Sequence, residues 1–109
     1  MKYPAIVTPA SDIEGAFVVS FRDIPEALTQ GENLEDALFM AKDALITSMD
    51  FYFEDRRPVP LPSRPRKGEH SIELPASITI KILLLNEILA SGIKHGVLGK
   101  ALKSGFPDA

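Results

Sequence analysis

The chain has 109 residues, nine prolines, no cysteine and a formal net charge of −3. A chain of this length forms one domain, with room for a short additional module. Without cysteine it can form neither disulfides nor thiolate metal sites. No apolar signal core follows Met1, and no apolar run approaches the ~20 residues that span a membrane, so we expect a cytoplasmic protein that contacts no membrane.

The charged residues are distributed unevenly. Residues 1–55 contain eleven acidic and three basic side chains, whereas residues 56–109 contain four acidic and nine basic side chains. An acidic half suits a basic protein partner, and a basic half suits nucleic acid. An uneven solvated surface that arose by chance explains the same split equally well, so charge alone leaves the partners open.

The first 31 residues predict an antiparallel hairpin and a short third strand. Residues 2–8 and 16–21 alternate between two faces, and the polar turn 9–15 joins them. Ala27 to Gln30 form the predicted third strand, which Gly31 closes. The side chains expected on the core face of the hairpin are Tyr3, Ala5, Val7, Phe17, Val19 and Phe21.

An amphipathic helix is predicted for residues 34–53. Asn33 is a suitable N-cap residue for it. Apolar residues at three- and four-residue spacing indicate a helix that covers the apolar face of the hairpin. These residues are Leu34, Ala37, Leu38, Ala41, Leu45, Met49 and Tyr52. Of the aromatic residues 51–53, which acids flank, we expect at least two to close the core, although aromatics beside charges also anchor interfaces.

The second half of the chain predicts a proline-rich linker, a strand and helices. Residues 71–74 are expected to return to the sheet or to pair with another chain. A helix from about Ser77 to Gly92 is apolar around most of its circumference, which indicates cover by a second subunit and hence a homodimer or higher oligomer. The predicted dimerisation residues are Ile82, Leu85, Ile88 and Leu89, and a third short helix would contain Val97, Leu98, Ala101 and Leu102.

Three common catalytic motifs are absent from the sequence. It contains no glycine-rich phosphate loop, no nucleophile elbow and no HExxH motif, and its two histidines, His70 and His95, are expected to be ordinary solvated side chains. The first two strands supply no inward-facing acid, although a two-metal nuclease needs carboxylates that converge on its ions. We therefore expect no enzyme, no catalytic residue, no metal site and no cofactor.

Several segments of the chain together resemble the HicB antitoxins. The most specific is the order of strand, Asp-x-Pro turn, glycine and capped helix between Gly15 and Ala37. The resemblance covers roughly residues 1–93. It is carried by residues 2–7, 15–25, 29–37, 41–45, 50–55, 61–63 and 84–86.

The resemblance implies an antitoxin rather than an enzyme. It implies a degenerate RNase H-like N-terminal fold that binds and occludes a HicA-type toxin, a small basic ribonuclease that cleaves mRNA. It also implies a helix-turn-helix region that pairs subunits and represses the operon's own promoter. Only seven residues follow Leu102 here, too few for a recognition helix, so promoter binding is expected of a longer form.

The expected organisation is therefore an α+β fold in three regions. Residues 1–55 form the toxin-binding domain, in which one helix covers a small antiparallel sheet. Residues 56–70 form the linker, and residues 71–109 form a helical dimerisation region that resembles a partial helix-turn-helix.

Four acidic residues near the hairpin and the following turn are the candidate toxin contacts. A ribonuclease surface that binds RNA is basic, and an inhibitor can mimic the phosphate charge. The candidates are Asp12, Glu14, Asp23 and Glu26, and a solvated loop charge is the alternative interpretation for each. The competing function is a metal-dependent nuclease of RNase H ancestry, which would cleave RNA alone when magnesium is added.

Overall fold

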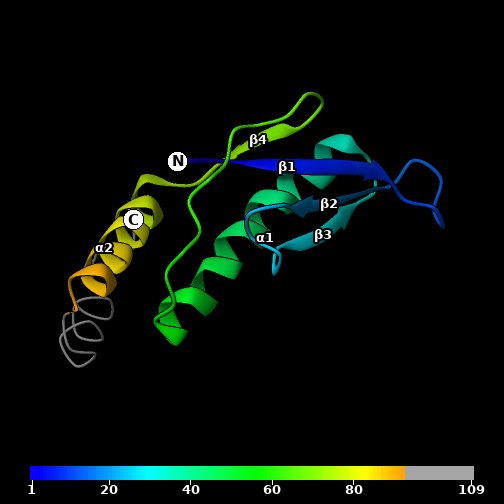
Figure 1. Ribbon diagram of the computed structural model, residues 1–109. Coiled ribbons are helices and arrows are strands. Elements are labelled where there is room, and N and C mark those ends of the chain that lie inside the picture. Colours follow the sequence, from blue (N-terminus) through cyan, green and yellow to red (C-terminus); the bar gives the residue numbers. More distant parts are fainter. Residues whose placement is uncertain (93–109) are drawn as a thin grey trace.

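A computed structural model describes residues 1–92, which form an α+β fold (Figure 1). The four strands in this part of the chain form one antiparallel sheet in the order β3-β2-β1-β4. The α+β class and the antiparallel sheet are confirmed. The elements in chain order are β1 (Lys2–Pro9), β2 (Phe17–Phe21), β3 (Leu28–Gly31), α1 (Leu34–Asp55), β4 (His70–Glu73) and α2 (Ala76–Ser91).

The register of the sheet places alternate residues on a covered and an open face. β1 pairs with β2 so that Ala5 lies opposite Phe21 and Val7 lies opposite Val19. The core on the face that α1 covers contains the buried side chains of Tyr3, Ala5, Val19 and Phe21. Val7 is partly buried against this core, whereas Leu28 is 66% exposed. β4 pairs with β1, with Ile72 opposite Tyr3, so the predicted strand near residue 71 returns to the sheet of its own chain.

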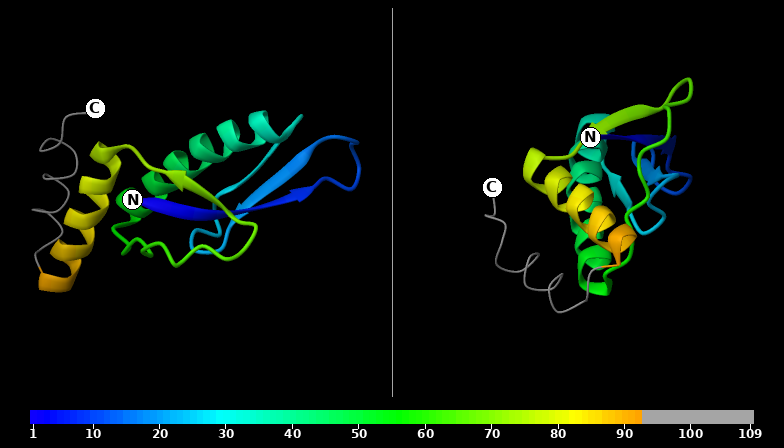
Figure 2. Two further views of the ribbon diagram at one scale, coloured as in Figure 1. Left: turned by 90° about the horizontal axis from the view of Figure 1, so that it is seen from above. Right: turned by 60° about the vertical axis from the view of Figure 1, so that its left-hand side comes forward.

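Helix α1 runs along one face of the sheet (Figure 2). Asn33 caps it as predicted, because its side chain accepts a hydrogen bond from the backbone N–H of Asp36 at 2.8 Å. Leu34 is 40% exposed, contrary to the predicted core stripe. As the first helical residue, Leu34 lies at the margin of the contact between helix and sheet. The predicted stripe is otherwise fully or partly buried, at Ala37, Leu38, Ala41, Leu45, Met49 and Tyr52.

Two of the three aromatic residues 51–53 at the end of α1 close the core, as expected. Tyr52 is buried and Phe53 packs against the core, whereas Phe51 is 50% exposed. The helix ends at Arg56, which adopts a left-handed backbone conformation with φ 53° and donates its N–H back to the last helical turn.

Residues 56–69 contain no helix or strand, yet they pack against the rest of the protein. The side chain of Val59 is buried in the core, and the hydroxyl of Tyr3 donates a 2.6 Å hydrogen bond to the carbonyl of Pro60. Asn86 of α2 contacts the backbone of Val59 twice, accepting from its N–H at 2.7 Å and donating to its carbonyl at 2.9 Å. This segment therefore fastens α2 to the sheet.

Helix α2 lies beside the end of the molecule where β1 begins and α1 ends (Figures 1 and 2). It begins one residue before Ser77 and ends before Gly92, whose φ of 76° suits a glycine C-cap. Its buried side chains join the core formed by the sheet and α1. Residues of all three predicted regions thus meet in one core, while the domain boundaries at residues 55 and 70 stay predictions.

Residues 93–109 lie outside the described part, and with them His95 and the predicted third helix with Val97, Leu98, Ala101 and Leu102. Neither helix in residues 1–92 has the length and apolarity to cross a membrane.

Candidate functional site

The four candidate acids lie in two pairs at opposite ends of β2. Asp12 and Glu14 lie in the loop that leads into this strand, and Asp23 and Glu26 lie in the turn that follows it. A strand of five residues spans about 16 Å at the usual rise per residue. The structure therefore does not bring the two pairs together.

Asp12 and Glu14 are exposed in the β1–β2 loop. The loop is closed by a 2.8 Å hydrogen bond from the backbone N–H of Ala10 to the carbonyl of Ala16, and it turns at Gly15, where φ is 83°. Within residues 1–92, neither carboxylate forms a hydrogen bond or an ion pair. Both charges therefore face solvent and are accessible to a partner.

Asp23 holds the segment of residues 56–69 against the sheet. Its Oδ2 atom accepts hydrogen bonds from the backbone N–H of Ser63 at 2.9 Å and from the Ser63 hydroxyl at 3.0 Å. The neighbouring Arg22 donates to the carbonyl of Arg64 at 3.0 Å and forms an ion pair with Glu69. These contacts give Asp23 a structural role inside the chain.

Glu26 belongs to a second internal cluster at the end of α1. The hydroxyl of Tyr52 donates to Glu26 Oε1 at 2.7 Å, and the guanidinium of Arg57 pairs with Oε2 at 3.3 Å. That guanidinium also lies 4.2 Å from the centre of the Tyr52 ring, a favourable cation–π geometry. The hydrogen bond from Tyr52 lowers the pKa of Glu26, while burial and then Glu26 raise the pKa of Tyr52 to about 12.

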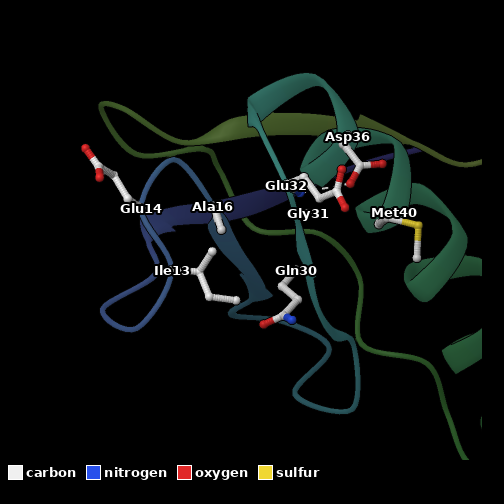
Figure 3. A pocket seen from close by; sticks show the side chains of 8 residues that line it. All are labelled: Ile13, Glu14, Ala16, Gln30, Gly31, Glu32, Asp36 and Met40. Carbon is white, nitrogen blue, oxygen red and sulfur yellow. Dashed lines mark hydrogen bonds between the residues drawn. The ribbon is translucent and has the colours of Figure 1, made fainter.

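A groove lies beside the first pair of acids, between the β1–β2 loop, the end of β3 and the first turns of α1 (Figure 3). We call it the acidic groove, because three of its lining side chains are acidic and none is basic. Asp36 helps to shape it: its Oδ2 atom accepts a 2.9 Å hydrogen bond from the backbone N–H of Glu32. The lining residues are Ile13, Glu14, Ala16, Gln30, Gly31, Glu32, Asp36 and Met40.

Gly31 allows the helix to approach the sheet at this groove. A Cβ atom on Gly31 would lie 2.3 Å from the backbone nitrogen of Ala37 and 2.5 Å from its Cα atom. Real contacts of this kind are essentially never so short, so a side chain here would force α1 away from β3. The glycine predicted to close the third strand thus also sets the width of the acidic groove.

The predicted dimerisation residues lie largely inside the single chain. Ile82, Leu85 and Ile88 are buried in the core, and Leu89 is partly buried against it. The large apolar side chains of α2 that are exposed are instead Ile80 and Leu83. The role of the four predicted residues in dimerisation stays a prediction, and in this structure they join α2 to the sheet and α1.

Several long-range contacts could not be predicted from local sequence patterns. Asn86 binds a backbone 27 residues away, and Arg22 binds Ser63 across 41 residues, so no local pattern reveals either contact. His70 lies on β4, and its side chain is partly exposed, as expected. Among residues 1–92, no three histidine or acidic side chains gather where they could hold a metal ion.

Comparisons with known proteins agree with one another. Residues 2–83 match the family model described as the HicB-like antitoxin of bacterial toxin–antitoxin systems. Antitoxin HicB of Escherichia coli (strain K12) is 51% identical over 102 residues, covering 94% of this chain and 72% of that protein. Antitoxin HicB 2 of Photorhabdus laumondii is 53% identical over 89 residues, which cover 82% of this chain and 63% of that protein. The chain therefore belongs to the HicB-like family of bacterial antitoxins.

Proposed function

We propose that this protein is an antitoxin that binds and neutralises a HicA-type mRNA-cleaving toxin. Membership of the HicB-like family is the observation that carries this proposal. The acidic composition of residues 1–55 supports it, because a ribonuclease surface that holds RNA is basic and attracts an acidic cover. The antitoxin acts by occupying the surface that would otherwise bind RNA, and it needs no catalytic group of its own.

The proposed toxin contacts are Asp12, Glu14, Asp23 and Glu26. Asp12 and Glu14 are the stronger pair, because their carboxylates have no partner within residues 1–92. Asp23 and Glu26 already accept hydrogen bonds from Ser63 and Tyr52, so a contact with the toxin would have to be shared with those bonds.

The finer features of the family also belong to this proposal. The sheet and α1 form a degenerate RNase H-like domain, and α2 belongs to a helix-turn-helix region that pairs subunits and represses the operon's own promoter. In this proposal the protein works in the cytoplasm, where mRNA and promoter DNA are present. The antiparallel sheet covered by one helix is compatible with the first assignment.

The deciding experiment co-expresses the tagged 109-residue chain with the small basic protein encoded beside it. We expect the two to co-purify, and we expect the complex to leave RNA intact while the partner alone cleaves it. A folded chain that captures no partner contradicts the proposal. The same assay tests the nuclease alternative, because cleavage of RNA by this chain alone with magnesium would identify an enzyme.

A further inference from the structure

The acidic groove combines an apolar floor with an acidic rim. The apolar lining residues are Ala16, which is buried, Ile13, which is 52% exposed, and Met40. The close-up shows Glu32 and Asp36 on the side formed by the start of α1, and Glu14 on the loop with its carboxylate pointing away from that helix (Figure 3). An extended side chain with an apolar stem and a polar head would fit this arrangement.

The carboxylates of the acidic groove have no ion-pair partner in the described residues, unlike Glu26 and Glu69. Glu26 and Glu69 are each paired with an arginine of the same chain. In the described residues, no basic side chain forms an ion pair with Glu14, Glu32 or Asp36. A cation from outside the chain would therefore gain attraction here without displacing an internal partner.

Hydrogen bonding also favours a donor as the occupant. The backbone N–H of Asp36 donates to Asn33, and that of Glu32 donates to Asp36, so neither N–H is free to bind an anion. The carboxylate of Glu32 and the amide oxygen of Gln30 remain as acceptors at the rim. Such a rim suits a group that carries several N–H donors and no acceptor.

We propose that the acidic groove receives one arginine side chain of the toxin, an inference that rests on the proposed function. The aliphatic stem of the arginine lies on Ile13 and Met40, as long basic side chains do on apolar surfaces. Its guanidinium donates to the carboxylate of Glu32 and to the amide oxygen of Gln30, because five donors in one plane can serve several acceptors. The groove thereby blocks a basic residue of the RNA-binding surface.

The test compares two exposed glutamates in the full 109-residue chain. Glu32→Lys places an ammonium in the acidic groove, whereas Glu54→Lys makes the same charge change on the last turn of α1. Calorimetry with the purified toxin measures both affinities, and circular dichroism confirms that both variants fold. We expect Glu32→Lys to weaken binding about 100-fold, because it opposes like charges at a close contact, and Glu54→Lys to weaken it less than about threefold.

A second measurement identifies the partner residue as an arginine. Each exposed arginine of the toxin is changed to glutamate and tested against the wild-type chain and against Glu32→Lys. One such toxin variant should bind the wild-type chain more weakly than the unchanged toxin does. The same variant should bind Glu32→Lys at least about tenfold more tightly than the unchanged toxin does, because two charges in contact are energetically coupled.

The outcomes separate this inference from the proposed function. If the wild-type chain binds the toxin and Glu32→Lys binds it as tightly as Glu54→Lys does, the arginine site is wrong and the antitoxin function stands. Loss of binding with Glu32→Lys that no toxin arginine variant restores also overturns the arginine assignment. If the folded wild-type chain binds no toxin, the proposed function fails and the arginine site fails with it.

Discussion

Gly31 shows how a single residue controls the position of α1. The residue has room for hydrogen only, because the backbone of Asp36 and Ala37 lies where a Cβ atom would be. We expect Gly31→Ala to lower the free energy of unfolding by about 3 kcal/mol, the upper part of the range for overpacking, since backbone atoms cannot rotate away. Urea denaturation measures the change.

Gly68 provides the matched control for this prediction. It has a positive φ of 85°, but a Cβ atom there would meet nothing within 4 Å. Gly68→Ala should therefore cost only the backbone penalty of about 1 kcal/mol. If Gly31→Ala and Gly68→Ala lowered the free energy of unfolding equally, this would contradict the close approach of α1 to β3.

Glu26 links the stability of the chain to pH. The hydrogen bond from Tyr52 and the nearby Arg57 hold its pKa below the ordinary value of 4.5 in the folded protein. A lowered pKa in the folded state stabilises the fold above the unfolded pKa, and this contribution is lost as the pH falls through the folded pKa. Glu26→Gln keeps an acceptor for Tyr52 but loses the charge.

We expect Glu26→Gln to be less stable than the wild type at pH 7 by up to about 1 kcal/mol, the range for exposed ion pairs. The difference should shrink at pH 3, because this pH lies below the ordinary value of 4.5 and the contribution of a lowered pKa is lost as the pH falls. Urea midpoints at both pH values measure it. Glu54→Gln, whose carboxylate has no partner in the described part of the chain, should show no such pH-dependent difference. If Glu26→Gln were still less stable than the wild type by the same amount at pH 3, the assigned role of the charge would be wrong.

At the scale of the element, α1 depends on its N-terminal cap. Asn33 accepts from the backbone N–H of Asp36, and Asp36 accepts from that of Glu32, so one reciprocal pair of side chains orders the first turn. Asn33→Ala should destabilise the protein by about 1 kcal/mol. Asn33→Ser should retain most of the stability, because a serine oxygen also caps well, and thermal unfolding followed by circular dichroism compares the two variants.

The side-chain amide of Asn86 joins helix α2 to the segment of residues 56–69. Asn86 satisfies both the N–H and the carbonyl of Val59, whose side chain is buried. Asn86→Ala should cost about 2 kcal/mol, because it leaves backbone groups unpaired. Glu87→Ala, an exposed change on the same helix, is the control. Faster amide hydrogen exchange at Val59 in Asn86→Ala, but not in Glu87→Ala, is the expected signature.

At the scale of the whole molecule, charge governs how the proposed complex forms. Residues 1–55 carry eleven acidic and three basic side chains, so encounter with a basic toxin should be electrostatically steered. Raising the salt concentration from about 0.05 M to about 0.5 M should slow association at least about tenfold, because the Debye length shortens, and should change dissociation much less. Stopped-flow fluorescence measures both rates. A salt-independent association rate would contradict a contact made through acidic side chains.

The sequence by itself determined the elements and the family. Apolar patterns and turn residues together predicted each strand and both described helices to within one or two residues. For the hairpin and α1 the signal was hydrophobic periodicity, because the spacing of apolar side chains follows directly from helix and strand geometry. Asn33 and Gly92 marked helix ends for local reasons of capping. The motif from Gly15 to Ala37 was specific enough to indicate HicB antitoxins, which the comparisons confirm.

Tertiary structure decided what no local pattern contains. It separated Asp12 and Glu14 from Asp23 and Glu26, because β2 lies between the two pairs, and it gave the second pair partners within the chain. It buried Ile82, Leu85 and Ile88 in the chain's own core, although the sequence showed only that α2 is apolar on several sides. The acidic groove likewise exists only because three segments meet at Gly31, since contacts across the sheet depend on register rather than on sequence spacing.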